Sequence, residues 1–339
     1  MIVSKTPLRM SFAGGGSDLP AYYRQEEGAV LSTAIDKYMY VSVNKKFDGD
    51  IRLSYSITED VDRINKLKHP IVRNVLDMLN ITGGIEIASM ADIPSKGSGL
   101  GSSSSYTVAL LHALYAYNNK HISKNELGRL ASHVEIDLCG EPIGKQDQYA
   151  AAFGGLNLIR FHSDESVSVD PIICRPDTIK RMEKSILIFY TGRTRSASAL
   201  LSEQSENIKR GDKRVLMREM VKLAYDMKYL LETDDLDAVG ELLDKNWKLK
   251  CQMASGVTDF QIDTWYNKGI QAGAKGGKLL GAGNGGFMMF FAPPENHPNI
   301  ISAMKELRRI PLLFDNNGSQ IIICQSSNSI TSQQIKTTI

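Results

Sequence analysis

A glycine and serine run at residues 94–105 constrains this chain more than any other feature, because it leads directly into an apolar helix. The run reads Pro-Ser-Lys-Gly-Ser-Gly-Leu-Gly-Ser-Ser-Ser-Ser, and the helix predicted after it covers residues 103–117. Small or apolar residues lie on almost every side of this helix, which predicts that it is buried. Glycines leave backbone N–H groups free to surround an anion, and a helix N-terminus adds about half a positive charge. The pattern therefore predicts a phosphate chain bound at the start of a buried helix.

Two other interpretations of residues 94–105 involve no ligand: a flexible linker, or a loop that is capped by Ser102. A flexible linker gives no reason for a fully apolar helix to follow it. The run also lacks the Gly-Lys-Ser/Thr ending of a Walker A loop and the strand with Gly-x-Gly-x-x-Gly of a dinucleotide fold. A different family of phosphate-binding loops is required.

Length and composition predict two domains, and the near-neutral charge means that any bound anion must be met by a local site. A chain of 339 residues with 42% apolar residues can fill more than one core. Two prolines within residues 171–176 predict the boundary, so that the domains cover residues 1–172 and 177–325 and a flexible tail covers residues 326–339. The 40 basic and 38 acidic residues leave a net charge of +2, which argues against nucleic acid or membrane partners and is compatible with a homodimer.

The N-terminus and the cysteines predict a cytoplasmic protein. The first residues form no signal peptide, and no uncharged apolar stretch approaches the ~18 residues of a membrane span. The four cysteines form no CxxC pair and have no histidine at a zinc-site spacing, so we expect reduced, mostly buried thiols. They are Cys139, Cys174, Cys251 and Cys324.

Hydrophobic periodicity predicts an α+β fold in both halves of the chain. In the first half we expect a mostly antiparallel sheet, with strands at residues 2–12, 30–43, 51–55 and 85–89 and a hairpin at residues 154–161 and 167–170. Helices are expected there at residues 63–79, 103–117 and 125–138. In the second half we expect one layer, with strands at residues 185–190, 287–291 and 320–324 and helices at residues 197–208, 213–232, 236–253 and 259–272.

Three motifs together resemble one known superfamily. Residues 94–105 resemble the second motif of the GHMP kinases, which include galactokinase, homoserine kinase, mevalonate kinase and phosphomevalonate kinase. Residues 7–18, Pro-Leu-Arg-Met-Ser-Phe-Ala-Gly-Gly-Gly-Ser-Asp, resemble the first motif, and residues 278–287, Lys-Leu-Leu-Gly-Ala-Gly-Asn-Gly-Gly-Phe, resemble the third. The resemblance implies a two-domain GHMP kinase fold, with a ribosomal-protein-S5-like N-terminal domain and a ferredoxin-like α+β C-terminal domain. It also implies an ATP-dependent sugar kinase.

The resemblance places ATP and Mg²⁺ at the glycine and serine run. The residues expected to bind ATP are Pro94, Gly97, Gly99, Leu100, Gly101, Ser102, Ser103 and Ser104. Magnesium needs few protein ligands when phosphates also bind it, and Ser103 and Glu135 match the family's ligands. Without the family, Glu135 would be an ordinary exposed acid on a helix.

The resemblance also assigns two catalytic residues. Asp147, within residues 144–148, matches the aspartate that faces the substrate hydroxyl, and a carboxylate there can take the proton of that hydroxyl. Arg9 matches a basic residue near that aspartate, where it would stabilise the transferring phosphoryl group. Asp147 can act as the base or chiefly orient the hydroxyl, and without the family it would be a helix-capping or surface aspartate.

The remaining candidate residues concern the acceptor. Asp18 matches the aspartate that holds sugar hydroxyls in galactokinase-like members, which favours a sugar over an isoprenoid acid. Arg193 and Arg195 open a helix after a strand and a glycine, so they could bind a phosphate on the sugar. Their alternative is a solvated basic turn that pairs with local acids. The expected substrate-binding residues are Gly14, Gly15, Gly16, Ser17, Asp18, Gly192, Arg193, Arg195, Gly283 and Asn284.

The triple-glycine first motif and the Thr-Gly-Arg-Thr-Arg segment most resemble the bacterial D-glycero-D-manno-heptose 7-phosphate kinases. This implies transfer of a phosphoryl group from ATP to the anomeric hydroxyl, giving the 1,7-bisphosphate for GDP-heptose and surface polysaccharide. One alternative is a GHMP kinase for an unphosphorylated sugar such as fucose or galactose. Another is a non-catalytic relative that binds ATP and sugar. A nucleic-acid-binding module is disfavoured, because the charge is near neutral and no aromatic and basic stripe is present.

Overall fold

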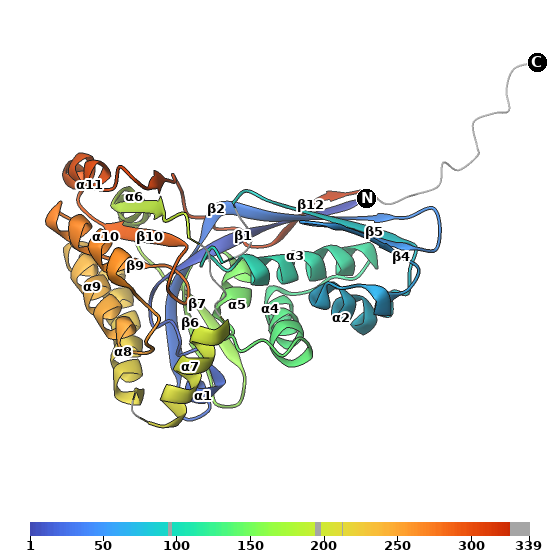
Figure 1. Ribbon diagram of the computed structural model, residues 1–339, viewed down its shortest axis with the longest axis horizontal. Helices are drawn as coiled ribbons and strands as arrows, with labels where there is room; N and C mark the ends of the chain where they lie inside the picture. The colour runs from blue at the N-terminus through green and yellow to red at the C-terminus, as the bar shows by residue number, and fades with distance from the viewer. Residues whose placement is uncertain (94–96, 194–197, 212, 326–339) are drawn as a thin grey trace, which may run out of the picture.

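The computed structural model describes residues 1–93, 97–193, 198–211 and 213–325, and Figure 1 shows their arrangement. The first half of the chain builds most of an eight-stranded sheet, in the order β12-β1-β2-β5-β3-β4, with β6 on β2 and β7 on β6. Its strands are β1 Ile2–Ala13, β2 Gly28–Lys45, β3 Ile51–Ser54, β4 Thr58–Val61, β5 Ile85–Ala91, β6 Leu156–Phe161, β7 Val167–Pro171 and β12 Gln320–Cys324. The strand pairs of this sheet among the described residues are antiparallel, except that β3 pairs with β5 in parallel. The prediction of a mostly antiparallel sheet is therefore confirmed.

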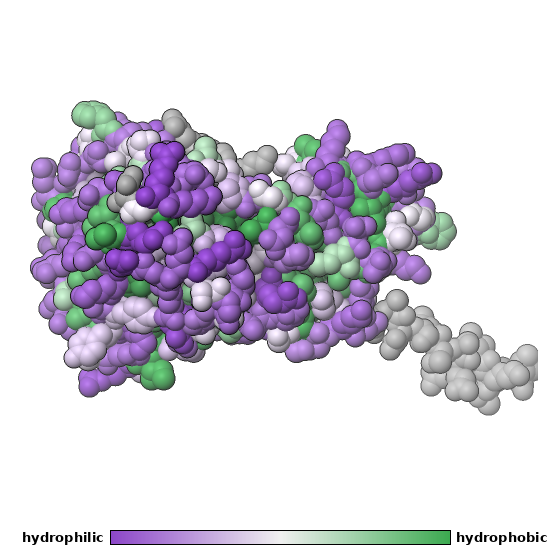
Figure 2. Space-filling model, turned by 90° about the horizontal axis from the view of Figure 1, so that it is seen from below, coloured by the Kyte–Doolittle hydropathy of each residue, from purple (hydrophilic) through white to green (hydrophobic). Residues whose placement is uncertain are grey.

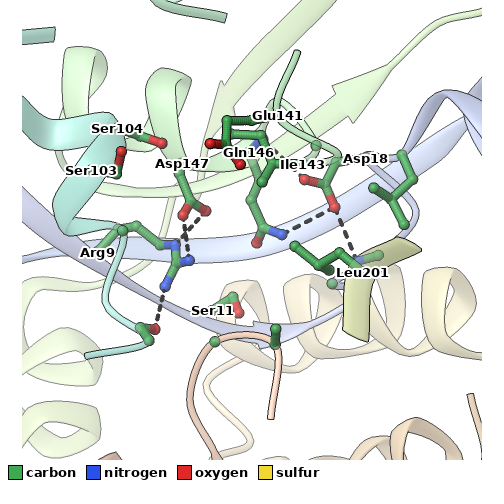
Figure 3. Close-up of a pocket in the computed structure, with 18 of the residues that line it drawn as sticks. Arg9, Ser11, Asp18, Ser103, Ser104, Glu141, Ile143, Gln146, Asp147 and Leu201 are labelled. Carbon is green, nitrogen blue, oxygen red and sulfur yellow. Dashed lines mark hydrogen bonds and ion pairs between the residues drawn. The ribbon is translucent and has the colours of Figure 1, made fainter. Parts of the chain in front are cut away.

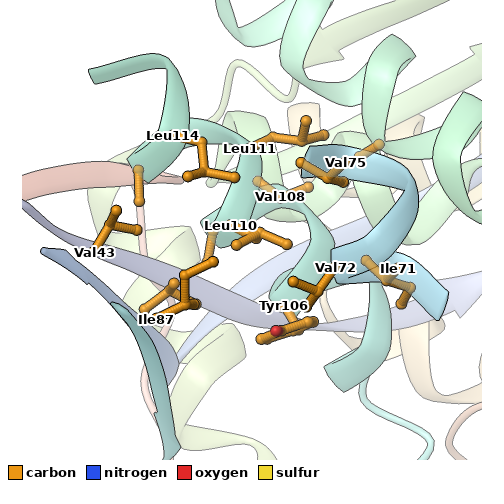
Figure 4. Packing of buried hydrophobic residues seen from close by; sticks show 14 of the residues in the cluster. Val43, Ile71, Val72, Val75, Ile87, Tyr106, Val108, Leu110, Leu111 and Leu114 are labelled. Atoms are coloured by element: carbon orange, nitrogen blue, oxygen red, sulfur yellow. The ribbon is translucent and has the colours of Figure 1, made fainter. Parts of the chain in front are cut away.

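Helices cover one face of this sheet (Figure 1). Helix α3 is buried along nearly its whole length, as its apolar sequence predicts. Its Leu110 packs into the core between the sheet residues Val43 and Ile87 and the α2 residue Val72 (Figure 4). The helices of this part are α1 Pro20–Tyr23, α2 Pro70–Met78, α3 Ser102–Tyr117, α4 Lys124–Ser132 and α5 Gln146–Phe153.

Two of the predicted helices differ from the structure. The helix expected at residues 63–79 begins only at Pro70, after a short 3₁₀ turn at Ile64–Lys66. Proline has no N–H and restricts the residue before it, so His69 is extended and the helix cannot reach further back. The helix expected at residues 125–138 is α4 followed by a π-helical turn at His133–Leu138.

A second, four-stranded antiparallel sheet has the order β11-β8-β10-β9. Its strands are β8 Ile186–Tyr190, β9 Gly276–Leu279, β10 Phe287–Phe291 and β11 Arg308–Arg309. The four expected helices are present as α7 Ser198–Lys209, α8 Arg214–Glu232, α9 Asp237–Cys251 and α10 Phe260–Gln271. The prediction missed the short strands β9 and β11, helix α6 Pro176–Lys184, helix α11 His297–Ala303 and the 3₁₀ turn Pro294–Asn296.

The strand at residues 320–324 is a correction, because we expected it in the second layer. It is β12, and it pairs with β1 at the edge of the first sheet, with Cys324 opposite Ile2. The pairing gives backbone partners to an edge of β1 that would otherwise be open. The chain therefore returns to its first layer, while the predicted domain boundary stays a prediction and the predicted tail at residues 326–339 lies outside the described residues.

The two layers share one hydrophobic cluster. It joins Leu8 and Phe12 of β1 to Leu243 of α9 and Phe287 of β10. Two buried polar contacts add to it, because Lys278 Nζ donates to the carbonyls of Ser11 and Phe12 at 2.9 and 3.2 Å, and the Gly14 N–H donates to Asn246 Oδ1 at 3.3 Å. These contacts fix the end of β1 against the second layer.

The face of the protein seen from below is mostly polar (Figure 2), and the cysteines are free. Figure 2 shows hydrophilic side chains over most of the face seen from below, with apolar residues between them. Among the described residues, no helix combines the length and the apolar character needed to cross a membrane. The four cysteines are free, as expected, but the prediction that they are mostly buried is wrong, because Cys324 is exposed and the other three are only partly buried.

Candidate active site

A cavity of about 620 Å³ lies where the two layers meet. Its walls come from β1, the loop before α3, the start of α5, α7, α9 and the glycine-rich loop between β9 and β10. Most of the expected site residues line it. They are Arg9, Gly15, Gly16, Asp18, Gly97, Gly99, Gly101, Ser102, Ser103, Ser104, Glu135 and Asp147.

A buried ion pair stands at the centre of the cavity (Figure 3). Arg9 donates from Nε to Asp147 Oδ1 at 2.7 Å and from Nη2 to Asp147 Oδ2 at 2.6 Å, so the planar guanidinium meets both carboxylate oxygens. The two side chains are 6% and 22% exposed. Asp147 is therefore not a solvated surface aspartate, and the pair leaves part of its carboxylate facing the cavity.

The same arginine also forms hydrogen bonds with the backbone of the glycine and serine loop. Its Nη1 donates to the carbonyl of Gly99 at 2.8 Å, and its backbone N–H donates to the carbonyl of Leu100 at 3.0 Å. Gly97, Gly99 and Gly101 have φ angles of 64°, 74° and 75°, which L side chains rarely adopt. The hydrogen bonds to Arg9 and these φ angles define one conformation of the loop, which argues against a flexible linker.

The loop residues divide into two groups. Gly97, Gly99, Gly101 and the serines 102–104 line the cavity at the N-terminus of α3, where a helix favours anions. Leu100 instead points into the shared core, with only 2% of its surface exposed. Pro94 lies outside the described residues. The role of these residues in ATP binding stays a prediction.

Glu135 is buried beside Ser103. Ser103 Oγ donates to Glu135 Oε1 at 2.7 Å, and Gln148 Nε2 donates to Glu135 Oε2 at 2.6 Å. Burial raises the pKa of Glu135 to about 6, although the Ser103 hydrogen bond opposes this shift. The π-helical turn carries this acid inward, so the alternative of an exposed helical acid is wrong.

These two side chains fit a magnesium ion chemically. A hydroxyl and a carboxylate are hard oxygen ligands of the kind that Mg²⁺ prefers. The described residues form no group of three or more His, Cys, Asp or Glu side chains that would hold a metal by themselves. A magnesium ion at Ser103 and Glu135 would therefore need phosphate and water oxygens as its other ligands.

Asp18 is held in one orientation at the other end of the cavity. Oδ1 accepts from the Gly16 N–H and from Gln146 Nε2, both at 3.0 Å, and Oδ2 accepts from the Gln146 N–H at 3.2 Å. Burial raises the pKa of Asp18, and the nearby charge of Asp147 raises it further. Gly144 allows this packing, since a Cβ there would lie 1.9 Å from Asp18 Oδ2.

Gly14 and Ser17, by contrast, do not line the cavity. A Cβ on Gly14, whose φ is +84°, would lie 1.9 Å from the carbonyl oxygen of Ala29. Ser17 Oγ donates to that carbonyl at 3.1 Å and accepts from the Ala29 N–H at 3.0 Å. These contacts shape the loop that carries Asp18.

Arg193 also lies apart from the cavity lining. Arg193 Nη2 donates to Asp259 Oδ2 at 2.6 Å and to Asn284 Oδ1 at 3.3 Å. Gly192, Gly283 and Asn284 do not line the cavity either, and Arg195 lies outside the described residues. This pairing agrees with the alternative of a basic turn bound to a local acid, and a role in substrate binding stays a prediction.

Sequence reasoning missed several residues that line the cavity. Lys250 of α9 is 5% exposed, and its Nζ donates to the carbonyl of Gly281. Gln204 Nε2 and Gln146 Oε1 are buried and have no hydrogen-bond partner among the described residues. Ser11 follows Arg9 by two positions and so shares its face of the strand, which is a signal that could have identified it.

Comparison with known proteins agrees with this geometry. The family model described as "GHMP kinases N terminal domain" matches residues 65–155, and "GHMP kinases C terminal" matches residues 227–308. A D-glycero-alpha-D-manno-heptose 7-phosphate kinase of Campylobacter jejuni is 32% identical over 319 residues, which cover 90% of this chain and 93% of the relative. A bifunctional fucokinase/GDP-fucose pyrophosphorylase of Arabidopsis thaliana is 26% identical over 84% of this chain and 29% of its own length.

Solved structures show the same fold. A D-glycero-D-manno-heptose 1-phosphate kinase from Bacteroides thetaiotaomicron has a TM-score of 0.79 at 25% identity, over 96% of this chain and all of that chain. The galactokinase of Lactococcus lactis has a TM-score of 0.73 at 20% identity, over 94% of each chain. This chain therefore belongs to the GHMP kinase family. It is an ATP-dependent kinase with the two-part α+β fold that the motifs predicted.

We predict that Gly281→Ala weakens nucleotide binding, whereas Gly211→Ala does not. Both glycines have positive φ, +80° and +89°, so both variants should lose about 1–2 kcal/mol of stability. Only at Gly281 would the new Cβ meet another loop, 2.4 Å from the Cα of Gly99, while nothing lies within 4 Å at Gly211. Calorimetric titration with a non-hydrolysable ATP analogue should show binding weaker by about tenfold or more in Gly281→Ala alone. Equal affinities in the two variants would contradict the prediction.

Proposed function

We propose that this kinase transfers the γ-phosphoryl group of ATP to the anomeric hydroxyl of D-glycero-D-manno-heptose 7-phosphate, releasing the 1,7-bisphosphate and ADP. The observation that carries the proposal is the Arg9 and Asp147 pair, which lies between the phosphate-binding loop and Asp18 in one cavity. The 32% identity to a heptose 7-phosphate kinase over nearly the whole length supports the choice of acceptor. The product would feed the cytoplasmic synthesis of GDP-heptose for surface polysaccharide.

Asp147 would receive the proton of the attacking hydroxyl. Each of its carboxylate oxygens accepts one hydrogen bond from Arg9, which leaves acceptor capacity for the hydroxyl. As the hydroxyl oxygen bonds to the γ-phosphorus, the bond from that phosphorus to the β-γ bridging oxygen breaks and ADP leaves with the electron pair. Arg9 keeps its charge throughout and stabilises the negative charge on the transferring group.

Ser103 and Glu135 would hold Mg²⁺ at the start of α3. Gln148 donates to the Glu135 carboxylate and fixes its orientation, as hydrogen-bond partners of metal ligands commonly do. When bound, the ion neutralises charge on the β- and γ-phosphates.

Asp18 would orient the sugar. Its contacts to Gly16 and Gln146 hold the carboxylate in place before any ligand binds, so its remaining lone pairs can accept from sugar hydroxyls. Gln146 and Gln204 line the same cavity, and each has a buried amide atom without a hydrogen-bond partner among the described residues, so both would supply further polar contacts.

A kinase for an unphosphorylated sugar of the fucose or galactose type is the second candidate. It is favoured by the position of Arg193, which pairs with Asp259 and does not line the cavity. A sugar without a phosphate would need no arginine from this segment. The fucokinase relative at 26% identity is compatible with this candidate.

A panel of acceptors tests the main proposal. The purified chain is given ATP and magnesium with heptose 7-phosphate, galactose, fucose or mevalonate, and ADP release is measured by a coupled assay. We expect turnover of the heptose 7-phosphate, with the new phosphate on the anomeric oxygen by phosphorus NMR. Turnover of galactose or fucose but not of the heptose phosphate would favour the second candidate.

Arg193→Met separates the two candidates. In the parent chain, Arg193 would have to leave Asp259 in order to bind the sugar phosphate. If it does so, the variant lacks the contact between the guanidinium and the sugar phosphate. Its KM for the phosphorylated sugar should then rise by about tenfold or more, while its KM for ATP stays nearly unchanged. Arg52→Met is the matched control, because Arg52 lies on the distant strand β3, is 48% exposed and pairs with Glu86 of β5. An unchanged KM for the sugar phosphate would remove Arg193 from the site.

Asp147→Asn tests the catalytic role of the carboxylate. The amide has nearly the same shape but cannot take a proton, so we expect kcat to fall by about 10²- to 10⁴-fold. Asp164→Asn, in an exposed turn, should keep the activity of the parent chain. A kcat within about threefold of the parent would show that Asp147 is not the base.

A further inference from the structure

Lys250 is a buried charge in the active-site cavity that the reaction described above does not use. It lies near the end of α9, lines the cavity and is 5% exposed. Its Nζ donates to the carbonyl of Gly281, and no carboxylate of the described residues lies within ion-pair distance of it. An ammonium group has three donors, and burying it without an anion costs free energy. A ligand anion would offset this cost.

Lys250 lies near Arg9 at the cavity. Arg9 of the first layer donates a hydrogen bond to the carbonyl of Gly99, and Lys250 of the second layer donates one to the carbonyl of Gly281. The two glycines touch backbone to backbone, since a Cβ on Gly281 would lie 2.4 Å from the Cα of Gly99. Two cations, one from each layer, therefore lie beside the same glycine contact at the cavity.

The nearby carboxylates already have partners. Asp147 is paired with Arg9, and Asp18 accepts three hydrogen bonds from Gly16 and Gln146. Burial, and then the charge of Arg9 on β1, lower the pKa of Lys250 to about 8, while Asp18, Asp147 and the adjacent Cys251 oppose this shift. Lys278 of β9 is the remaining amine in this group, and burial lowers its pKa well below the usual range.

Lys278 shows what a purely structural lysine looks like in this fold. It is fully buried, donates to two backbone carbonyls of β1 and does not line the cavity. Lys250 has one such carbonyl and does line the cavity. The difference leaves Lys250 with donors for a ligand.

We propose that Lys250 binds a phosphoryl group in the cavity and is the second cation of the active site. The inference rests on the proposed phosphoryl transfer, which brings two such groups into this space. One is the γ-phosphate of ATP, and the other is the phosphate already on the sugar. Because Lys250 faces the same space as Arg9 and Asp147, either source gives it an anion to neutralise.

Lys250→Met removes the charge and keeps most of the side-chain length. Its matched control is Lys248→Met on the same helix, where the lysine is 66% exposed and pairs with Asp244. Calorimetry measures the binding of ADP, of a non-hydrolysable ATP analogue and of heptose 7-phosphate to both variants and to the parent chain. Lys250→Met should bind ADP as the parent does and lose about tenfold or more in affinity for one of the other two ligands.

The ligand that is lost identifies the source of the phosphoryl group. Weaker binding of the ATP analogue assigns Lys250 to the γ-phosphate, and weaker binding of the heptose phosphate assigns it to the acceptor. If Lys250→Met binds all three ligands as the parent does, the proposal is overturned. The comparison of ADP with the ATP analogue needs no sugar, so it still tests Lys250 if the heptose phosphate proves not to be the acceptor.

A measurement on the parent chain covers the case in which Lys250→Met does not fold. A lysine with a lowered pKa loses its proton as the pH rises through about 8. The affinity for the identified ligand, taken relative to ADP, should therefore fall between pH 7 and pH 9, roughly one unit either side of that value. A ratio that does not change with pH would overturn the proposal.

Discussion

The buried ion pair between Arg9 and Asp147 is the contact on which the site depends. Arg9 meets both oxygens of Asp147, and it also donates to the carbonyls of Gly99 and Leu100. One side chain and its backbone thereby join strand β1, the glycine loop and the start of α5. A largely buried charge pair is tolerated where its geometry is good and further hydrogen bonds support it, and here Arg9 meets both carboxylate oxygens and also donates to Gly99. The same pairing that fixes the loop also places the carboxylate at the cavity.

The second requirement is close approach of the two layers. Residues of β1 and of the second layer belong to one hydrophobic cluster, and Lys278 and Asn246 reach across to the end of β1. At the cavity, Gly99 and Gly281 touch without side chains between them. The third glycine-rich motif therefore acts here as a contact surface for the glycine and serine loop, and its Gly281 and Ala282 also line the cavity. The cavity belongs to neither layer alone.

The site concentrates charges that burial disfavours. Burial raises the pKa of Asp18 and of Glu135 and lowers that of Lys250. Each shift records a charged form that is destabilised until a counter-charge arrives. A metal ion beside Glu135 and a phosphoryl group beside Lys250 would supply such counter-charges, whereas sugar hydroxyls would donate hydrogen bonds to Asp18.

The sequence by itself determined the loop, the buried helix α3 and the three motifs, because glycine content and helical periodicity are local properties that act within a few residues. It also identified Arg9, Ser103, Glu135 and Asp147, which the structure brings into one cavity, although their chemical roles are still proposals. Tertiary structure alone decided the pairing of β12 with β1 and the ion pair between Arg193 and Asp259. It also decided that Lys250, a lysine on the core-facing side of α9, is buried beside the cavity. These features depend on contacts between residues distant in the chain, and no local pattern encodes which distant groups will meet.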